Sequence, residues 1–423
     1  MRIEILATGD EILTGKTVNT NYSYIARRLE EVGLTTHWGT VVGDDRMSLL
    51  EAFKLASERT DAVIVNGGLG PTIDDLSQDV AAEAAGTQLV LNEKWFARIQ
   101  DFYTRRGRVM PPNNKKQAML PDGAEFIDNP IGTACGFAIT IGGTRFFFTP
   151  GVPKEMRRMI DEQIIPRLLE MSGRKVVTRL KRFHSFGIGE SRADQMLSGI
   201  EDLAPNGGVK LGFQAHYPQL ETKLAAQGAT ETELDAMLAP VETAIRERLG
   251  NHIIAEDDAS LESVVINTLL ENHFTLATAE MFTGGGVAAR FVPKDGAADP
   301  FLRGIVSREL AQLCGAVGLG ADAAASGCSA EIASATAASL RKLSQSTHAL
   351  SVLIDLDDGA DRIEFGGSIN IAIADHDGVV TRHARMLGGR DWIRLGATDL
   401  AIDCLRRHLL GLPVDERIDF EKH

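Results

Sequence analysis

Three short apolar runs, at residues 3–7, 62–65 and 146–149, each lead through a glycine-containing loop into an amphipathic helical pattern. In the first repeat Asn19 or Thr20 is placed to cap the helix, and Gly33 follows its end. A short apolar run bounded by turn residues is typical of a buried strand, whereas apolar residues three or four apart are typical of one helix face. Strands that alternate with helices favour a largely parallel sheet covered by helices on both faces, which is an α/β fold.

The length of 423 residues exceeds what one hydrophobic core usually organises, so two or three domains are expected. The pattern changes to a smaller α+β type after about residue 173 and returns to alternating strands and helices from Leu261. In this last part we expect strands at 276–279, 349–355 and 368–374 and helices at 315–338 and 391–410. We therefore predict three domains, at 1–172, 173–256 and 257–423.

Charge and cysteine usage restrict the partners and the compartment. The net charge of −14 disfavours binding to nucleic acid, which relies on clustered lysine and arginine. The four cysteines are scattered without metal-binding spacing, and this favours a reducing, cytoplasmic environment. No export signal and no apolar stretch long enough to cross a bilayer are visible in the sequence, so we expect no membrane partner.

The second loop, Gly67-Gly68-Leu69-Gly70-Pro71, is the first candidate for a binding site. Glycines let backbone N–H groups approach an anion, and the helix that follows adds the positive end of its dipole. In open parallel sheets ligands bind beyond the carboxyl ends of the strands, where the three loops should meet. The loop is thus a candidate phosphate cradle, although a tight connection without a ligand is an equally good interpretation of this turn alone.

Acidic pairs lie at the same strand exits, at residues 10–11, 44–45 and 74–75. Their shared position favours a hard divalent cation held against phosphate oxygens, with Asp10, Asp74 and Asp75 as metal ligands. Such an ion would neutralise a diphosphate and help to generate an attacking hydroxide, so cleavage of a pyrophosphate bond becomes accessible. Lys116 is a candidate phosphate ligand, and a solvated lysine in a polar loop is the alternative.

Several motifs then match in order across the first domain: 8–11, 19–21, 42–45, 67–75, 114–118, 129–134 and 150–155. With these residues the chain closely resembles the CinA family, named for competence and damage induction. The most specific of them is Gly-Gly-Leu-Gly-Pro-Thr-x-Asp-Asp at 67–75. The resemblance implies that the first domain is a three-layer αβα domain with the molybdopterin-binding fold of the MoaB and MogA proteins.

The same resemblance implies a metal-dependent ADP-ribose pyrophosphatase that yields AMP and ribose 5-phosphate. Positions matching the essential aspartates of the molybdopterin-handling relatives are Asp44 and Asp75, which we predict to be catalytic. The substrate-binding residues predicted with them are Asn21, Gly67, Gly68, Gly70, Lys116, Gly132 and Gly151. A molybdopterin-binding protein and a non-catalytic dimeric scaffold are the alternatives. The family also implies a homodimer.

The middle domain resembles the KH-type module of CinA proteins through residues 186–191. KH folds often bind single-stranded nucleic acid through a GXXG loop, but here the loop reads Gly-Ile-Gly-Glu, with an acid in place of a base. We therefore expect a spacer or a dimer-forming module.

The last domain resembles the nicotinamide-mononucleotide deamidase domain of the family, with departures at its site. The family's Ala-Glu-Ser-Cys-Thr-Gly-Gly loop is replaced at 279–285 by a loop in which Met281 stands for the nucleophilic serine. Ala311 lies near the position of the activating lysine, and residues 354–359 replace a substrate-binding turn. Thr283 lacks an identifiable neighbouring base. We expect this degenerate site to be inactive as an amidase.

Overall fold

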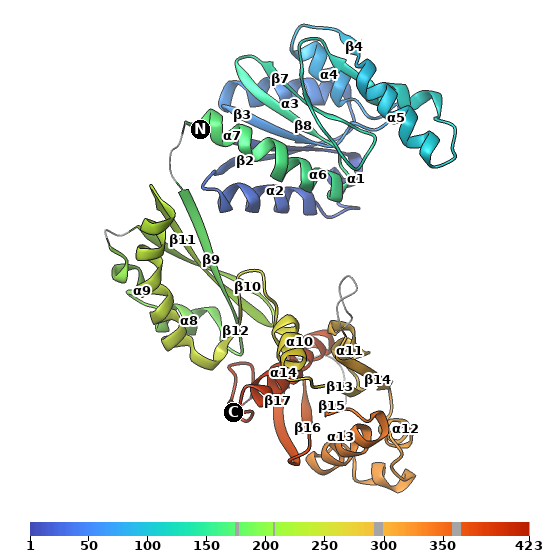
Figure 1. Ribbon diagram of the computed structural model, residues 1–423, viewed down its shortest axis with the longest axis vertical. Coiled ribbons are helices and arrows are strands. Elements are labelled where there is room, and N and C mark those ends of the chain that lie inside the picture. Colours follow the sequence, from blue (N-terminus) through green and yellow to red (C-terminus); the bar gives the residue numbers. More distant parts are fainter. Residues whose placement is uncertain (174–176, 206–207, 292–298, 358–364, 423) are drawn as a thin grey trace. The chain divides into compact units, whose positions relative to one another are not determined.

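The computed structural model describes residues 1–173, 177–205, 208–291, 299–357 and 365–422. The chain forms two compact units (Figure 1). The first unit comprises Met1–Arg179 and Gln227–Glu231, and the second comprises Leu180–Ala226 and Thr232–His423.

A six-stranded sheet in the order β2-β1-β3-β8-β7-β6 organises the first unit. Its strands are β1 (Ile3–Thr8), β2 (Thr36–Val42), β3 (Ala62–Asn66), β6 (Glu125–Ile127), β7 (Gly136–Ile141) and β8 (Thr144–Thr149). The four strands from β2 to β8 run parallel, whereas β7 and β6 are antiparallel to their neighbours. The carboxyl ends of β1, β3 and β8 therefore meet at one edge of the sheet.

Helices cover both faces of this sheet (Figure 1). They are α1 (Asp10–Leu13), α2 (Thr20–Glu31), α3 (Arg46–Arg59), α4 (Ser77–Ala84), α5 (Glu93–Arg105), α6 (Pro153–Met159) and α7 (Ile165–Ser172). A short β4 (Leu89–Leu91) pairs with β5 (Met119–Pro121), and helical turns occupy η1 (Pro112–Ala118) and η2 (Ile160–Ile164). One core packs α3, α4 and α5 around Phe53 and Trp95, and the other packs α2, α6 and α7 around Ile25 and Met156. The predicted three-layer αβα architecture is confirmed.

The second unit begins with a four-stranded sheet in the order β10-β11-β9-β12. Its elements are β9 (Val177–Phe186), α8 (Glu190–Met196), η3 (Ile200–Leu203), β10 (Val209–His216), β11 (Gln219–Gly228), α9 (Glu231–Leu249), η5 (Gly250–His252) and β12 (Ile253–Glu256). Leu234, Leu238, Val241 and Ile245 of α9 are buried at successive spacings of four, three and four residues, as expected for a helix that packs on a sheet. This is the small α+β pattern expected from the sequence.

The remainder of the second unit is a five-stranded sheet in the order β14-β13-β15-β16-β17. Its strands are β13 (Leu276–Met281), β14 (Phe301–Ser307), β15 (His348–Leu356), β16 (Gly366–Ala374) and β17 (Val379–Leu387). The helices around it are α10 (Leu261–Glu271), α11 (Gly286–Arg290), α12 (Leu310–Ala316), η6 (Ala321–Ser326), α13 (Ala330–Ser344) and α14 (Arg390–Leu409). One core joins the sheet to α10 and α14, and another joins it to α12 and α13. A second α/β domain is therefore confirmed as well.

One element differs from the sequence-based expectation. Residues 315–338 do not form a single helix: α12 ends at Ala316, and α13 begins at Ala330. Gly318 and Gly327 between them adopt positive φ angles of 82° and 74°, which a continuing helix cannot accommodate. Among the described residues, no helix is long and apolar enough to span a membrane.

Candidate functional site

A cavity of about 550 Å³ opens where β1, β3 and β8 end in the first unit. Thr8 ends β1, Asn66 ends β3 and Pro150 follows β8, and all three line the cavity. This position is the one in which open parallel sheets bind ligands. The cavity is therefore the candidate functional site.

Most of the residues predicted for the site line this cavity. They are Asn21, Asp44, Gly67, Gly68, Gly70, Asp74, Asp75 and Gly151. Asp10, Lys116 and Gly132 are not in the lining, although each contacts a residue close to it. Asp44 and Asp75, the two predicted catalytic residues, thus face one cavity together with the glycine turn.

The glycine turn presents free backbone donors to the cavity. Gly67 and Gly68 have φ angles of 114° and 68°, which favour glycine. A Cβ atom at Gly68 would also collide with the hydroxyl of Ser77, whose side chain donates to the Gly67 carbonyl at 2.9 Å. No residue in the described part of the chain accepts a hydrogen bond from the backbone N–H of Gly68, Leu69 or Gly70. Three adjacent donors are therefore available to an anionic ligand.

A buried network of amide side chains holds the strand ends beside the turn. Asn21, from α2, donates from Nδ2 to Asn66 Oδ1 at 2.9 Å and to the Gly151 carbonyl at 2.8 Å. Asn66 in turn donates to Thr149 Oγ1 at 3.1 Å and to the Pro150 carbonyl at 2.8 Å. Asn66 was not predicted as a site residue, because one asparagine at the end of an apolar run carries no distinctive signal.

Two buried polar atoms of the cavity lining are left without a partner among the described residues. They are Oγ1 of Thr8 and Oδ1 of Asn21, whose residues are 5% and 8% exposed. Buried polar groups are normally hydrogen-bonded, so these two atoms are exceptions beside the strand ends.

The carboxylates at the rim interact with each other. Asp44 Oδ2 accepts from the Asp10 amide at 3.2 Å, and Asp10 Oδ1 accepts from the Asp44 amide at 3.1 Å. Burial, together with the carboxylates of Asp10, Glu11 and Asp74, raises the pKa of Asp44. Asp75 Oδ2 accepts from the backbone and the hydroxyl of Thr72 at 2.8 and 2.5 Å. The rim therefore carries a negative potential, and a cation or an N–H donor of a ligand would reduce the repulsion between its carboxylates.

These carboxylates do not form a compact set of metal ligands. Among the described residues, no three potential ligand atoms of the cavity lie within 4.8 Å of one another. Hard divalent cations such as Mg²⁺ commonly use one or two carboxylates and complete their shell with water and phosphate oxygens. The predicted ligands Asp10, Asp74 and Asp75 therefore do not make a preformed cage.

Lys116 and Gly132 lie behind the lining. Lys116 Nζ donates to the Thr72 carbonyl at 2.8 Å, so the lysine braces the loop that carries Asp75. The Gly132 amide donates to Asn129 at 3.1 Å, and a Cβ atom at Gly132 would collide with the Glu155 carboxylate. The structure thus places both residues where they support the cavity wall.

The loop at 279–285 in the last domain is held by hydrogen bonds to the Glu280 carboxylate. Met281 ends β13 and is 8% exposed. Buried Thr283 donates its hydroxyl to the Glu280 carboxylate at 2.5 Å, and this carboxylate also accepts the Val287 and Ala288 amides at 2.9 and 2.8 Å. Glu280 therefore satisfies the free amides at the start of α11.

The other predicted positions of the degenerate deamidase site are less informative. Ala311 lies on α12 and is exposed. Residues 358 and 359 of the replaced turn lie outside the described residues.

Three family models match consecutive parts of the chain. Residues 4–170 match a family described as probable molybdopterin binding domain, and residues 180–255 match the damage-inducible protein CinA KH domain. Residues 258–409 match the CinA C-terminal domain. In order, these are the three modules that the sequence resemblance indicated.

Similar proteins match over nearly their full length. A CinA-like protein from Geotalea uraniireducens is 37% identical over 99% of this chain and 100% of its own. A protein from Acetivibrio thermocellus, named as competence-damage inducible, is 36% identical over 97% of this chain and 100% of its own. The crystal structure of the molybdopterin biosynthesis enzyme MoaB from Thermus thermophilus matches 41% of this chain and 97% of its own, with 19% identity and a TM-score of 0.29.

These comparisons correct the function predicted from the sequence. The prediction was that the first domain hydrolyses a nucleotide diphosphate, above all ADP-ribose, with the help of a metal ion, and that the last domain is inactive. The first domain matches a molybdopterin-binding description, the last matches the CinA C-terminal domain, and a relative is named for competence and damage induction, so that prediction is wrong. The physical reason is that free amides and carboxylates suit any phosphorylated ligand, whereas the described carboxylates do not converge on a metal-bound water. By its three modules and its full-length relatives, the chain belongs to the family of CinA-like proteins.

Proposed function

We propose that the first domain binds a phosphorylated small molecule of the molybdopterin type, a pterin that carries a phosphate group. One observation carries the proposal: Gly68, Leu69 and Gly70, whose backbone amides have no acceptor among the described residues, line one cavity together with Asp44. The description of the matching family as a probable molybdopterin-binding domain supports the choice of ligand.

The two ends of such a ligand would contact different residues of the cavity lining. The phosphate would accept hydrogen bonds from the amides of the glycine turn, which are charge-assisted and stronger than neutral ones. The 2-amino-pyrimidinone edge of a pterin presents adjacent N–H donors, and a carboxylate can accept both at once. Asp44 is the favoured acceptor, because burial and neighbouring carboxylates raise its pKa and a donor would relieve this repulsion.

We extend the proposal to the metal, the oligomer and the compartment. A divalent cation would bridge the ligand phosphate and one or two carboxylates among Asp44, Asp74 and Asp75, which line the cavity together. The homodimer implied by the family resemblance is to be tested by sedimentation of the full chain. A cytoplasmic location is supported by four cysteines that form no disulfide.

The experiment is a fluorescence titration of the full chain with a phosphorylated pterin and with the same pterin lacking its phosphate. Removal of one charge-assisted hydrogen bond should weaken binding about tenfold or more, so the unphosphorylated pterin should bind at least that much more weakly. Equal affinity for the two compounds would refute phosphate recognition.

A matched pair of glycine variants tests the place of binding. Gly68→Ala puts a methyl group against Ser77 in the turn, whereas Gly86 has the same φ of 68° and open space around its Cβ position, outside the cavity lining. Both variants carry the same backbone strain, so only Gly68→Ala should lose affinity for the phosphorylated pterin. An equal loss in Gly86→Ala would show that strain, and not the site, controls binding.

A further inference from the structure

A cluster of His348, Asp375 and His408 lies in the last domain, apart from the loop at Met281. His348 begins β15, Asp375 follows β16 and His408 lies in the last turn of α14. Since β13 and β15 run parallel with Leu276 opposite His348 and Met281 opposite Leu353, the cluster lies beside the start of these strands and the loop lies at their end. The cluster is therefore independent of the degenerate deamidase site.

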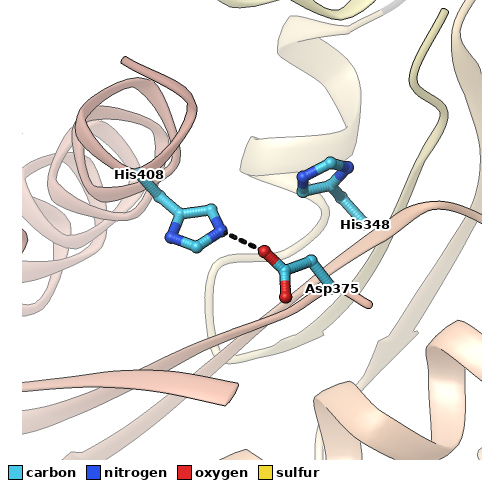
Figure 2. Close-up of side chains that lie close together, drawn as sticks. All are labelled: His348, Asp375 and His408. Carbon is cyan, nitrogen blue, oxygen red and sulfur yellow. Dashed lines mark hydrogen bonds and ion pairs between the residues drawn. The ribbon is translucent and has the colours of Figure 1, made fainter. Parts of the chain in front are cut away.

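The three side chains converge from three elements, as Figure 2 shows. Each offers one potential ligand atom, and these atoms all lie within 4.8 Å of one another. His408 Nε2 is 2.9 Å from Asp375 Oδ2. The separation of these atoms suits a shared cation, because a metal ion at 2.0–2.2 Å from each ligand places the ligands about 3–4 Å apart.

Hydrogen bonds among neighbouring residues orient the His348 ring for binding a metal ion. Thr347 Oγ1 lies 2.9 Å from His348 Nδ1 and 2.9 Å from the Thr275 carbonyl. A carbonyl can only accept, so the single hydroxyl proton of Thr347 goes to Thr275, and His348 must donate from Nδ1–H. Nε2 of His348 then carries the free lone pair. Metal-binding histidines are commonly held in this way by a hydrogen bond from the other ring nitrogen.

Asp375 is also held in place before any ion binds. Its Oδ1 accepts from the amides of Asp377 at 2.8 Å and Gly378 at 3.0 Å, which leaves Oδ2 directed at His408. His348 is 4% exposed, whereas Asp375 and His408 are half-buried. The site is thus rigid on one side and open to solvent on the other, as a site that takes up an ion and a water molecule requires.

We propose that His348, Asp375 and His408 bind a zinc ion, with water as the fourth ligand. Two imidazoles and one carboxylate suit zinc, which prefers nitrogen ligands in a tetrahedral arrangement, better than they suit calcium or magnesium, which prefer oxygen. The ion takes the place of the proton between His408 Nε2 and Asp375 Oδ2, and the ring keeps one proton on Nδ1. The bound ion ties the end of α14 to the first residue of β15 and the end of β16.

A second group, Asp375, His376 and Asp377, shares one residue with this cluster and offers a competing site. His376 and Asp377 are exposed. Ordered and partly buried ligands lose less side-chain freedom on binding, so the buried cluster should bind first. His376→Gln is therefore the matched control for His408→Gln, because each removes one imidazole close to Asp375.

The test is metal binding by the full chain after treatment with a chelator. Dialysis against ZnCl₂ followed by elemental analysis should find about one zinc ion per chain, and zinc should raise the melting temperature of the second unit. His408→Gln and His348→Gln should weaken zinc binding by about tenfold or more, whereas His376→Gln should leave it unchanged. Unchanged binding in His408→Gln, or a loss in His376→Gln alone, would overturn the proposal.

Cobalt provides a readout that does not depend on how well the variants fold. Co²⁺ in the unsubstituted chain should give the intense visible absorption of a four-coordinate site with nitrogen and oxygen ligands. The weak spectrum of six-coordinate Co²⁺ would contradict the site as described. Thr347→Val, which removes the hydrogen-bond partner of His348 Nδ1, should lower zinc affinity roughly ten- to a hundredfold.

Discussion

Asn66→Ala should destabilise the first unit strongly. The Asn66 side chain is 2% exposed and makes three hydrogen bonds, to Asn21, Thr149 and Pro150, at 2.9, 3.1 and 2.8 Å. The substitution removes all three and leaves the Pro150 carbonyl buried without its partner. An unsatisfied buried group costs about 1–3 kcal/mol, and partial access of water from the cavity limits the sum, so we expect a loss of about 2–4 kcal/mol.

Tryptophan fluorescence can follow this unit alone. The chain has three tryptophans, of which Trp38 and Trp95 belong to the first unit and Trp392 to the second. In a Trp392→Phe background, urea unfolding observed by fluorescence therefore reports the first unit. With a denaturant slope of about 2 kcal/mol/M, the expected loss shifts the midpoint by about 1–2 M urea.

Asn113→Ala is the matched control, because Asn113 belongs to the same unit and is exposed. Surface substitutions usually change stability by less than about 0.5 kcal/mol, so the midpoint should hardly move. If Asn66→Ala also changes the stability by less than this amount, the asparagine network does not hold the strand ends together. The account of how the cavity is built would then be refuted.

Three further outcomes are expected. Asp403→Ala should cost about 3–5 kcal/mol in the unfolding of the second unit, measured by calorimetry, because Asp403 accepts hydrogen bonds from the buried Arg406 and Arg407, and only Arg407 keeps a second carboxylate, Glu416. Hydrogen bonds from Arg246 lower the pKa of Glu256 from 4.5 to about 2. This carboxylate therefore stabilises the fold fully above pH 4.5 and progressively less as the pH falls towards 2. The difference in melting temperature between the wild type and Glu256→Gln should shrink over the same pH interval. Iodoacetamide should label half-buried Cys328 before Cys135, which is 1% exposed and whose pKa burial raises to about 12, as followed by mass spectrometry.

The architecture of the first domain was predictable because its signals are local. Apolar runs bounded by glycine mark β1, β3 and β8, and Asn19 caps α2 by accepting from the Tyr22 amide at 2.9 Å. The interruption between α12 and α13 was not predictable in the same way. Alanine-rich spacing favours a helix throughout 315–338, but Gly318 and Gly327 adopt left-handed conformations whose need arises from the tertiary turn.

The location of the candidate site could be predicted from the sequence, but its activity could not. Strand ends in a parallel sheet determine where the loops meet, so Asp44, Asp75 and the glycine turn could be placed together from the sequence. Whether a phosphorylated ligand is cleaved or held depends on how closely carboxylate oxygens approach, within one or two ångströms. Residue spacing does not determine such distances, and ADP-ribose hydrolysis was the wrong choice for this reason.

The histidine cluster could not be predicted from the sequence even as a location. His348, Asp375 and His408 come from distant parts of the last domain's sequence and follow no ligand spacing that a motif describes. Their convergence depends on the register of β15 against β16, which pairs Ala349 with Ala374 and so brings the residues before and after them to the same end. It depends as well on the length of α14, whose last turn reaches that end and directs His408 at Asp375. Deleting a single residue near the end of α14 would rotate the residue at this position by about 100° around the helix axis. Such a deletion should therefore abolish zinc binding, even though all three ligand residues remain in the chain.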